Sequence, residues 1–225
     1  MTTTKRFSFL MVAFLAISLL AGCGSAGQFD ELRYDEPSRY YLHVPSSYDQ
    51  NMRWPLFIAL HDRGDDSGDC IQDWFEIADE TQLFLLCPEL EVGDKLDSPV
   101  NERILADILN SLYQQFSLDN RFFLVGRNEA ASFALSYAYR YPQAIEGISA
   151  IEPASYPQTA GSANFPILLI VEPGDQPSLD AASAFEQSLS GSGTQTRLLE
   201  IDGIGNHIPF RVQRLTVDFF EQLSN

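Results

Sequence analysis

The stretch Phe122-Phe123-Leu124-Val125-Gly126-Arg127-Asn128-Glu129-Ala130 decides how this chain folds. The apolar run at 121–125 predicts a buried strand, and the spacing of apolar residues over 129–141 predicts a helix directly after it. Only a tight turn separates the two. A strand that passes so abruptly into a helix is typical of a βαβ unit in a parallel sheet.

The same alternation continues on both sides of this junction. Apolar runs predict further strands, and amphipathic patterns predict further helices. Because the strands are apolar throughout, both faces of the sheet should be covered by helices. The prediction is an α/β fold, a three-layer α/β/α sandwich with a mostly parallel sheet and no large lid domain. The expected strands are 39–44, 54–60, 83–87, 121–125, 145–151, 166–171 and 196–201, and the expected helices are 70–81, 101–116, 129–141, 180–189 and 209–223.

Small residues flank the centre of the junction, Gly126 before Asn128 and Ala130 after it. This spacing is that of G-x-S-x-G, a strained turn that lifts a serine hydroxyl above the sheet as a nucleophile. Here the pattern reads Gly-Arg-Asn-Glu-Ala. Glu129 directly follows the central residue, and its side chain faces either the pocket beside the turn or the solvent.

Two further groups follow in the order that such a site requires. Asp175 comes after the strand that ends at residue 171, in the place of the acid, and His207 comes after the last strand, in the place of the histidine. Asp180, near the expected start of a helix, competes with Asp175 for the acid role. His207 has the alternative of a hydrogen bond within its own loop.

These features resemble the α/β-hydrolase superfamily, and within it the small esterases that are like polyhydroxybutyrate depolymerases and feruloyl esterases. The resemblance covers nearly the whole chain after residue 36. It implies hydrolysis of short or aromatic acyl esters, a ligand of that kind, and no cofactor. The segments that carry it are Tyr41-Leu42-His43-Val44-Pro45, Pro55-Leu56-Phe57-Ile58-Ala59-Leu60-His61, Trp74 with Ala78-Asp79-Glu80, Leu118-Asp119-Asn120-Arg121, Arg140-Tyr141-Pro142 and Gly205-Asn206-His207.

Two departures from the family put its activity in doubt. Asn128 stands where the serine belongs, and a side-chain amide has no proton that a histidine can remove to create a nucleophile. The family's oxyanion loop begins His-Gly, whereas this chain has His61-Asp62. A carboxylate at Asp62 would oppose the negative charge that backbone N–H groups stabilise there.

The first residues predict export with a lipid anchor. Lys5 and Arg6 precede an apolar run over 7–20 that suits a signal peptide and is too short to span a bilayer. Leu20-Ala21-Gly22-Cys23 resembles a bacterial lipobox, in which the cysteine thiol receives lipid. We therefore expect a signal peptide at 1–22, a lipidated tether at 23–36 and a hydrolase-like domain at 37–225, on a bacterial membrane and facing the periplasm or the cell exterior.

The charge of the chain excludes one class of partner. Residues 1–22 hold two basic and no acidic residues, so the mature chain has 12 basic against 31 acidic residues, a net charge of −19. Nucleic acid is excluded because phosphate binding needs a basic surface. With Cys23 lipidated, Cys70 and Cys87 remain as a pair that forms either a disulfide or two buried thiols, and no spacing indicates a metal site.

Three hypotheses for function follow. The first is a degenerate hydrolase that retains the pocket for binding or the fold as a scaffold on the membrane. The second is an active carboxylic-ester hydrolase with a displaced nucleophile, through an aspartate formed at Asn128 or through Glu129 with His207. The third is an interaction protein in which the pocket has no role.

Overall fold

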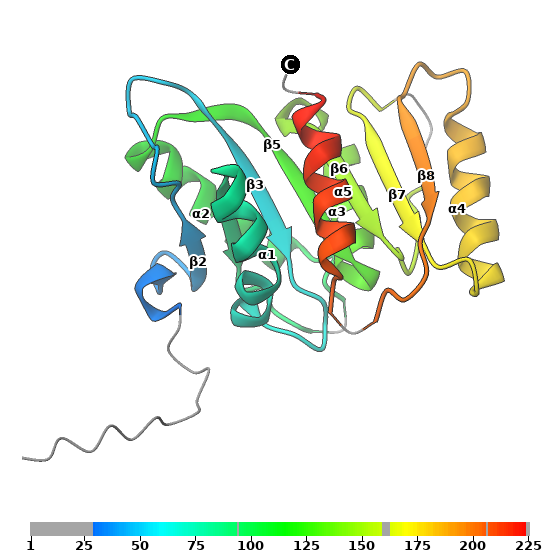
Figure 1. Ribbon diagram of the computed structural model, residues 1–225, viewed down its shortest axis with the longest axis horizontal. Helices are drawn as coiled ribbons and strands as arrows, with labels where there is room; N and C mark the ends of the chain where they lie inside the picture. Colours follow the sequence, from blue (N-terminus) through cyan, green and yellow to red (C-terminus); the bar gives the residue numbers. More distant parts are fainter. Residues whose placement is uncertain (1–28, 94, 159–162, 206, 224–225) are drawn as a thin grey trace, which may run out of the picture.

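A computed structural model describes residues 29–93, 95–158, 163–205 and 207–223 as one eight-stranded sheet covered by five α-helices (Figure 1). The fold class predicted from the sequence is confirmed. Among these residues no helix combines the length and apolar character needed to cross a bilayer. The strands are β1 (Arg33–Tyr34), β2 (Tyr40–His43), β3 (Trp54–Leu60), β4 (Phe84–Pro88), β5 (Leu118–Arg127), β6 (Ile145–Ile151), β7 (Ile167–Val171) and β8 (Thr196–Glu200), and the α-helices are α1 (Ser67–Thr81), α2 (Pro99–Gln115), α3 (Asn128–Arg140), α4 (Gln176–Leu189) and α5 (Phe210–Glu221).

The strands lie in the order β1-β2-β4-β3-β5-β6-β7-β8. β2 is antiparallel to both of its neighbours, whereas β3 to β8 all run parallel to one another. The carboxyl ends of β3, β5, β6 and β7 therefore meet at one edge of the sheet. Ligand sites of open α/β sheets form at this edge.

Helices pack on both faces because each strand buries alternate side chains on opposite sides. In β3, Leu56 and Ile58 belong to the apolar core on one face, and Phe57 and Ala59 belong to the core on the other. The first core includes apolar residues of α2, α3 and α4, and the second those of α1 and α5. Figure 1 shows α1 and α5 in front of the sheet and α3 behind it.

The folded domain begins before residue 37, where the sequence placed its boundary. Asp30–Leu32 forms a 3-10 turn (η1), and Arg33–Tyr34 adds β1 to the edge of the sheet. The Phe29 ring lies 5.0 Å from that of Phe75 on α1. The sequence did not predict this segment because its composition is acidic and a two-residue strand is too short to show a hydrophobic period. The expected signal peptide and Cys23 lie outside the described residues.

Candidate active site

The turn between β5 and α3 has the strained geometry that its sequence predicted. Asn128, at its apex, has φ 48°, in the left-handed region that non-glycine residues rarely adopt. A Cβ on Gly126 would lie 2.6 Å from the backbone carbon of Ala130, so the first turn of α3 crosses the strand too closely for any larger residue. The backbone therefore presents Asn128 at the carboxyl edge of the sheet.

The Asn128 side chain is bound to the carboxylate of Asp62. Its Nδ2 donates to Asp62 Oδ2 at 2.9 Å. The other carboxylate oxygen, Oδ1, accepts the backbone N–H of Glu129 at 3.2 Å. Glu129 directly follows the apex residue, and in a serine hydrolase of this architecture the N–H at that position is one of the oxyanion donors. In this chain an internal carboxylate already accepts that N–H.

A second contact fixes the same loop to the same turn. The Arg63 guanidinium donates from Nη2 to Glu129 Oε2 at 2.7 Å and from Nε to Oε1 at 3.0 Å. It also donates from Nη1 to the carbonyl oxygen of Gly93 at 2.9 Å. Two consecutive loop residues, Asp62 and Arg63, therefore bind two consecutive residues of the turn. We call these four residues the elbow latch.

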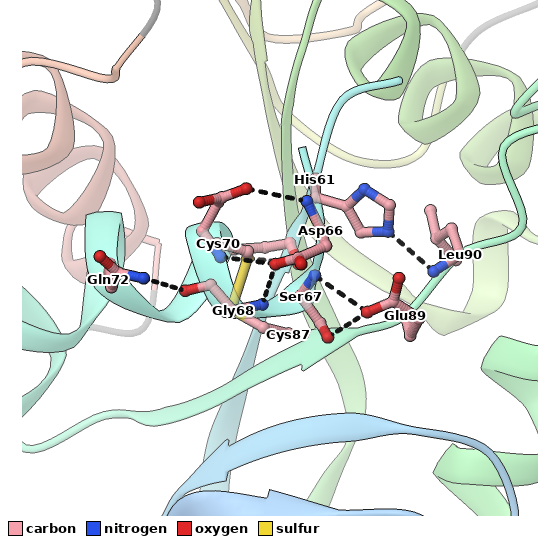
Figure 2. Close-up of a disulfide and its surroundings, with 11 residues drawn as sticks. His61, Asp66, Ser67, Gly68, Cys70, Gln72, Cys87, Glu89 and Leu90 are labelled. Atoms are coloured by element: carbon pink, nitrogen blue, oxygen red, sulfur yellow. Dashed lines mark hydrogen bonds between the residues drawn. A yellow bond between two sulfur atoms is a disulfide. The ribbon is translucent and has the colours of Figure 1, made fainter. Parts of the chain in front are cut away.

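The loop that carries the elbow latch is anchored on its other side (Figure 2). His61 is 3% exposed, and its Nε2 accepts the backbone N–H of Leu90 at 2.8 Å. Because Nε2 accepts, the proton of the neutral ring lies on Nδ1, 2.9 Å from the Asp62 carbonyl oxygen. His61 thereby holds the loop to the end of β4 and does not point a nitrogen at the turn.

A disulfide reinforces this anchor. Cys70 on α1 and Cys87 on β4 are joined, with their Cα atoms 5.9 Å apart. The N-terminus of α1 is closed by a capping box, in which Asp66 accepts from the backbone of Asp69 and Asp69 accepts from that of Asp66. Of the two states considered for the cysteines, the structure contains the disulfide.

Among the described residues, His207 pairs with α1 and makes no hydrogen bond to the apex residue. Its side chain is 83% exposed, and its Nδ1 is 3.4 Å from Asp73 Oδ1. The second oxygen of Asp73 accepts the backbone N–H of Ile208 at 3.5 Å. Burial raises the pKa of Asp73, and the nearby His207 acts against that rise. The loop before His207 is held by Arg127, which donates to the carbonyl oxygen of Gly205 and pairs with Asp65.

Asp175 has a structural role at the start of α4. Its Oδ2 accepts from the Ser178 hydroxyl at 2.8 Å, and its Oδ1 accepts the backbone N–H of Ser178 at 3.4 Å. Its competitor Asp180 accepts from Gln176 at 2.7 Å. Within the described residues, the carboxylate that faces His207 is that of Asp73, and neither Asp175 nor Asp180 contacts the histidine.

Several cavities adjoin the turn, and two of them divide the expected site between them. Asn128 and Asp175 line a pocket of about 540 Å³, together with Glu152, Tyr156 and other residues. Asp62 and His207 line a separate crevice of about 20 Å³. That volume holds about one water molecule. Asn128 and His207 therefore line different cavities in the described part of the chain.

Comparisons of the whole chain with solved structures agree on its architecture. A thermostable esterase matches with a TM-score of 0.61 and 14% identity, over 86% of this chain and 59% of its own. An S-formylglutathione hydrolase from Agrobacterium tumefaciens matches with 0.64 and 15%, over 83% and 88%. A ferulic acid esterase matches with 0.60 and 12%, over 82% and 90%. The chain has the α/β-hydrolase fold. No protein-family model and no curated protein matches the sequence.

Within the α/β-hydrolase fold, acyl transfer needs a nucleophile, a base beside it and free oxyanion donors. This chain has an amide at Asn128, an exposed histidine at His207 and a Glu129 N–H that already binds Asp62. The described residues also contain no group of three or more His, Cys, Asp or Glu side chains that could hold a metal ion.

Sequence reasoning missed two acidic residues beside this turn. Asp73 is one polar residue within an amphipathic helix, and only the packing of α1 beside residues 207–208 brings it to His207. Glu152 follows β6 and has φ 47°, so two neighbouring strands, β5 and β6, are each followed by a strained residue that lines the larger pocket. Burial, and then the neighbouring Glu172, raises the pKa of Glu152.

Proposed function

We propose that this chain is an exported lipoprotein whose α/β-hydrolase domain does not hydrolyse esters and acts by binding a ligand at its retained pocket. One observation carries the proposal. The Asp62 carboxylate bonds both the apex amide and the N–H of Glu129, and so occupies the place that an oxyanion would need.

Chemistry at the apex supports this function. A serine hydroxyl attacks a carbonyl because a base removes its proton as the new bond forms. The lone pair of the Asn128 amide nitrogen is delocalised into its carbonyl, so it is a poor nucleophile. Among the described residues no histidine base contacts the apex either, since no hydrogen bond joins His207 to Asn128 and the His207 side chain is 83% exposed.

Electrostatics at the elbow latch adds a second barrier. A developing oxyanion near the Glu129 N–H would lie beside the Asp62 charge. Two like charges about 4 Å apart repel by roughly 4 kcal/mol at an effective dielectric constant near 20. An oxyanion donor normally contributes about 3 to 4 kcal/mol in the opposite direction. The repulsion is thus as large as the stabilisation that an unoccupied donor would supply.

The binding role is favoured over a scaffold role by the larger cavity. Its volume, about 540 Å³, lies in the usual range of small-molecule sites, roughly 300 to 1,000 Å³. It opens at the carboxyl edge of the sheet, where ligands of such sheets bind.

The anchor is proposed from residues 20–23, and the disulfide supports export because such bonds persist in oxidising compartments. Exchanging Cys23 for serine should leave the folded domain unlipidated and release it from membranes. Intact mass of the membrane-extracted protein measures the lipid directly. A membrane-bound chain without added lipid mass would refute the anchor and leave the hydrolase argument untouched.

The claim that the domain does not hydrolyse esters is tested by measuring ester turnover. Purified domain from residue 24 onward should hydrolyse p-nitrophenyl acetate, p-nitrophenyl butyrate and methyl ferulate no faster than heat-denatured protein. A saturable rate that disappears in one single-residue variant would refute the proposal. Mapping that residue would identify the displaced nucleophile.

A further inference from the structure

We infer that the elbow latch is a displaceable partition, and that release of Asp62 joins the pocket beside Asn128 to the crevice beside His207. The inference rests on the proposed binding role and concerns how access to that same pocket is controlled. The resting chain keeps the two cavities apart, and a second arrangement of one loop makes them a single cleft. Neither arrangement requires ester hydrolysis.

The elbow latch lies where the cavities beside the turn meet. Asn128 lines the pocket of about 540 Å³, and Asp62, which accepts from Asn128 Nδ2 at 2.9 Å, lines the crevice of about 20 Å³ together with His207. Arg63 and Glu129, the other pair of the latch, line a third cavity of about 370 Å³. The hydrogen bond between Asn128 and Asp62 therefore joins a residue of the pocket to a residue of the crevice, so breaking it opens one toward the other.

Residues 62–65 form the tip of the loop, and polar contacts hold this tip in place. Apart from Gly64 its side chains are charged, and none of the four residues belongs to either apolar core. The Arg63–Glu129 ion pair is partly exposed, with side-chain exposures of 42% and 38%. A segment with few buried apolar contacts and exposed hydrogen bonds opens at a lower free energy than the core around it. The tip can therefore be released while the domain stays folded.

Both ends of the loop are fixed, which limits the movement to the tip. His61 is buried and accepts from the backbone of Leu90, and Asp66 caps the start of α1. The disulfide described above holds the same part of α1 to β4. Only four residues lie between His61 and Asp66. Release therefore consists of turning the side chains of the tip away from α3, without a wide movement of the loop.

Hydrogen exchange of the Glu129 amide measures this release directly. That N–H lies at the start of α3, and it donates to Asp62 Oδ1 at 3.2 Å. In the ¹⁵N-labelled domain from residue 24 onward, its exchange rate should be nearly independent of urea at low concentrations, because a local opening exposes little surface. The amide of Phe133, buried in the same helix, should show a steep dependence on urea because its exchange requires global unfolding.

Two substitutions at one position and a matched control identify the contact. Asp62→Ala removes both acceptor oxygens and should accelerate exchange of the Glu129 amide at least about tenfold, as expected for loss of a hydrogen bond to a charged group. Asp62→Asn keeps the size of the side chain but only one acceptor oxygen, so its acceleration should be smaller. Asp65→Asn removes a charge from the same loop at a residue that pairs with Arg127, and should change the rate less than twofold.

Crystal structures test the consequence for the cavities. Asp62→Ala should contain one continuous cavity that reaches both Asn128 and His207, whereas the natural domain should keep the two cavities apart. The amide spectrum of each variant checks that it is folded. Should Asp62→Ala not fold, the urea dependence of exchange in the natural domain decides the question by itself.

The inference fails if the Glu129 amide of the natural domain exchanges with the same urea dependence as that of Phe133, because the latch then opens only when the domain unfolds. Unchanged exchange in a folded Asp62→Ala variant, or two cavities that remain separate in its crystal structure, would also overturn it. No ester takes part in these measurements, so each of these results leaves the non-hydrolytic proposal standing. Conversely, ester turnover in the earlier assay would refute that proposal and leave the exchange measurements to be judged by themselves.

Discussion

Placing serine at the apex is expected not to create an esterase. In Asn128→Ser the new hydroxyl has no histidine base beside it among the described residues, because His207 is 83% exposed and lines a different cavity from position 128. Loss of the histidine in a serine hydrolase costs on the order of 10⁶ in turnover. The Asp62 carboxylate still occupies the Glu129 N–H, and its repulsion of roughly 4 kcal/mol corresponds to about a further 10³. The single variant should therefore hydrolyse p-nitrophenyl acetate at the background rate.

Removing the Asp62 carboxylate as well should recover only the rate increase that comes from stabilising the oxyanion. Asn128→Ser with Asp62→Gly frees the Glu129 N–H, and one such donor contributes about 10² to 10³. The matched control is Asn128→Ser with Asp65→Gly, since Asp65 lies in the same loop but pairs with Arg127. Initial rates and a burst of p-nitrophenolate distinguish the three proteins. Burst kinetics in the single variant, or an equal rate in both double variants, would refute the reasoning about Asp62.

Three further results are expected. Exchange of Cys70 and Cys87 for serine should lower the free energy of unfolding in urea by about 3 kcal/mol, because the disulfide closes a loop with a sequence separation of 17; an unchanged unfolding midpoint would contradict this. Gly126→Ala should destabilise the fold by roughly 3 kcal/mol, because its Cβ meets backbone at 2.6 Å, whereas Gly64→Ala, with nothing within 4 Å, should be near neutral in the same titration. Burial raises the pKa of Glu152 in the folded state. The charged carboxylate therefore lowers the stability of the fold above that pKa. This loss of stability disappears at low pH, where Glu152 is protonated in both the folded and the unfolded protein. Glu152→Gln should therefore be more stable than the natural chain at pH 7 and equal to it at about pH 3; a stability gain that is independent of pH would show that charge is not its cause.

Most of the architecture could be predicted from the sequence because hydrophobic periodicity reports burial directly. The strand at 54–60 and that at 145–151 match β3 and β6 to the residue, since each is a continuous apolar run with clear ends. Helix starts were less accurate. We expected α1 from residue 70 and α4 from residue 180, but the caps Asp66 and Asp175 begin these helices earlier. The capping signals lie outside the apolar pattern on which the ranges were based.

The site could be predicted only in part. The strained turn at Asn128 could be predicted from local sequence, and so could the carboxylate of Asp62 beside the oxyanion donors. Each of these residues stands at a fixed offset from the end of a strand. The direct bond between them depends on how the β3–α1 loop folds over α3. The pairing of His207 with Asp73 joins residues that lie far apart in sequence, and no local pattern encodes that contact.

Intact-mass analysis after exposure to a fluorophosphonate tests the central claim most directly. The reagent forms a covalent adduct with an activated serine, and this chain is proposed to have none at its elbow. The purified domain, incubated beside a known serine esterase, should keep its unmodified mass while the esterase gains one adduct. A stoichiometric adduct on this chain, mapped to a serine that lines either cavity, would contradict the account.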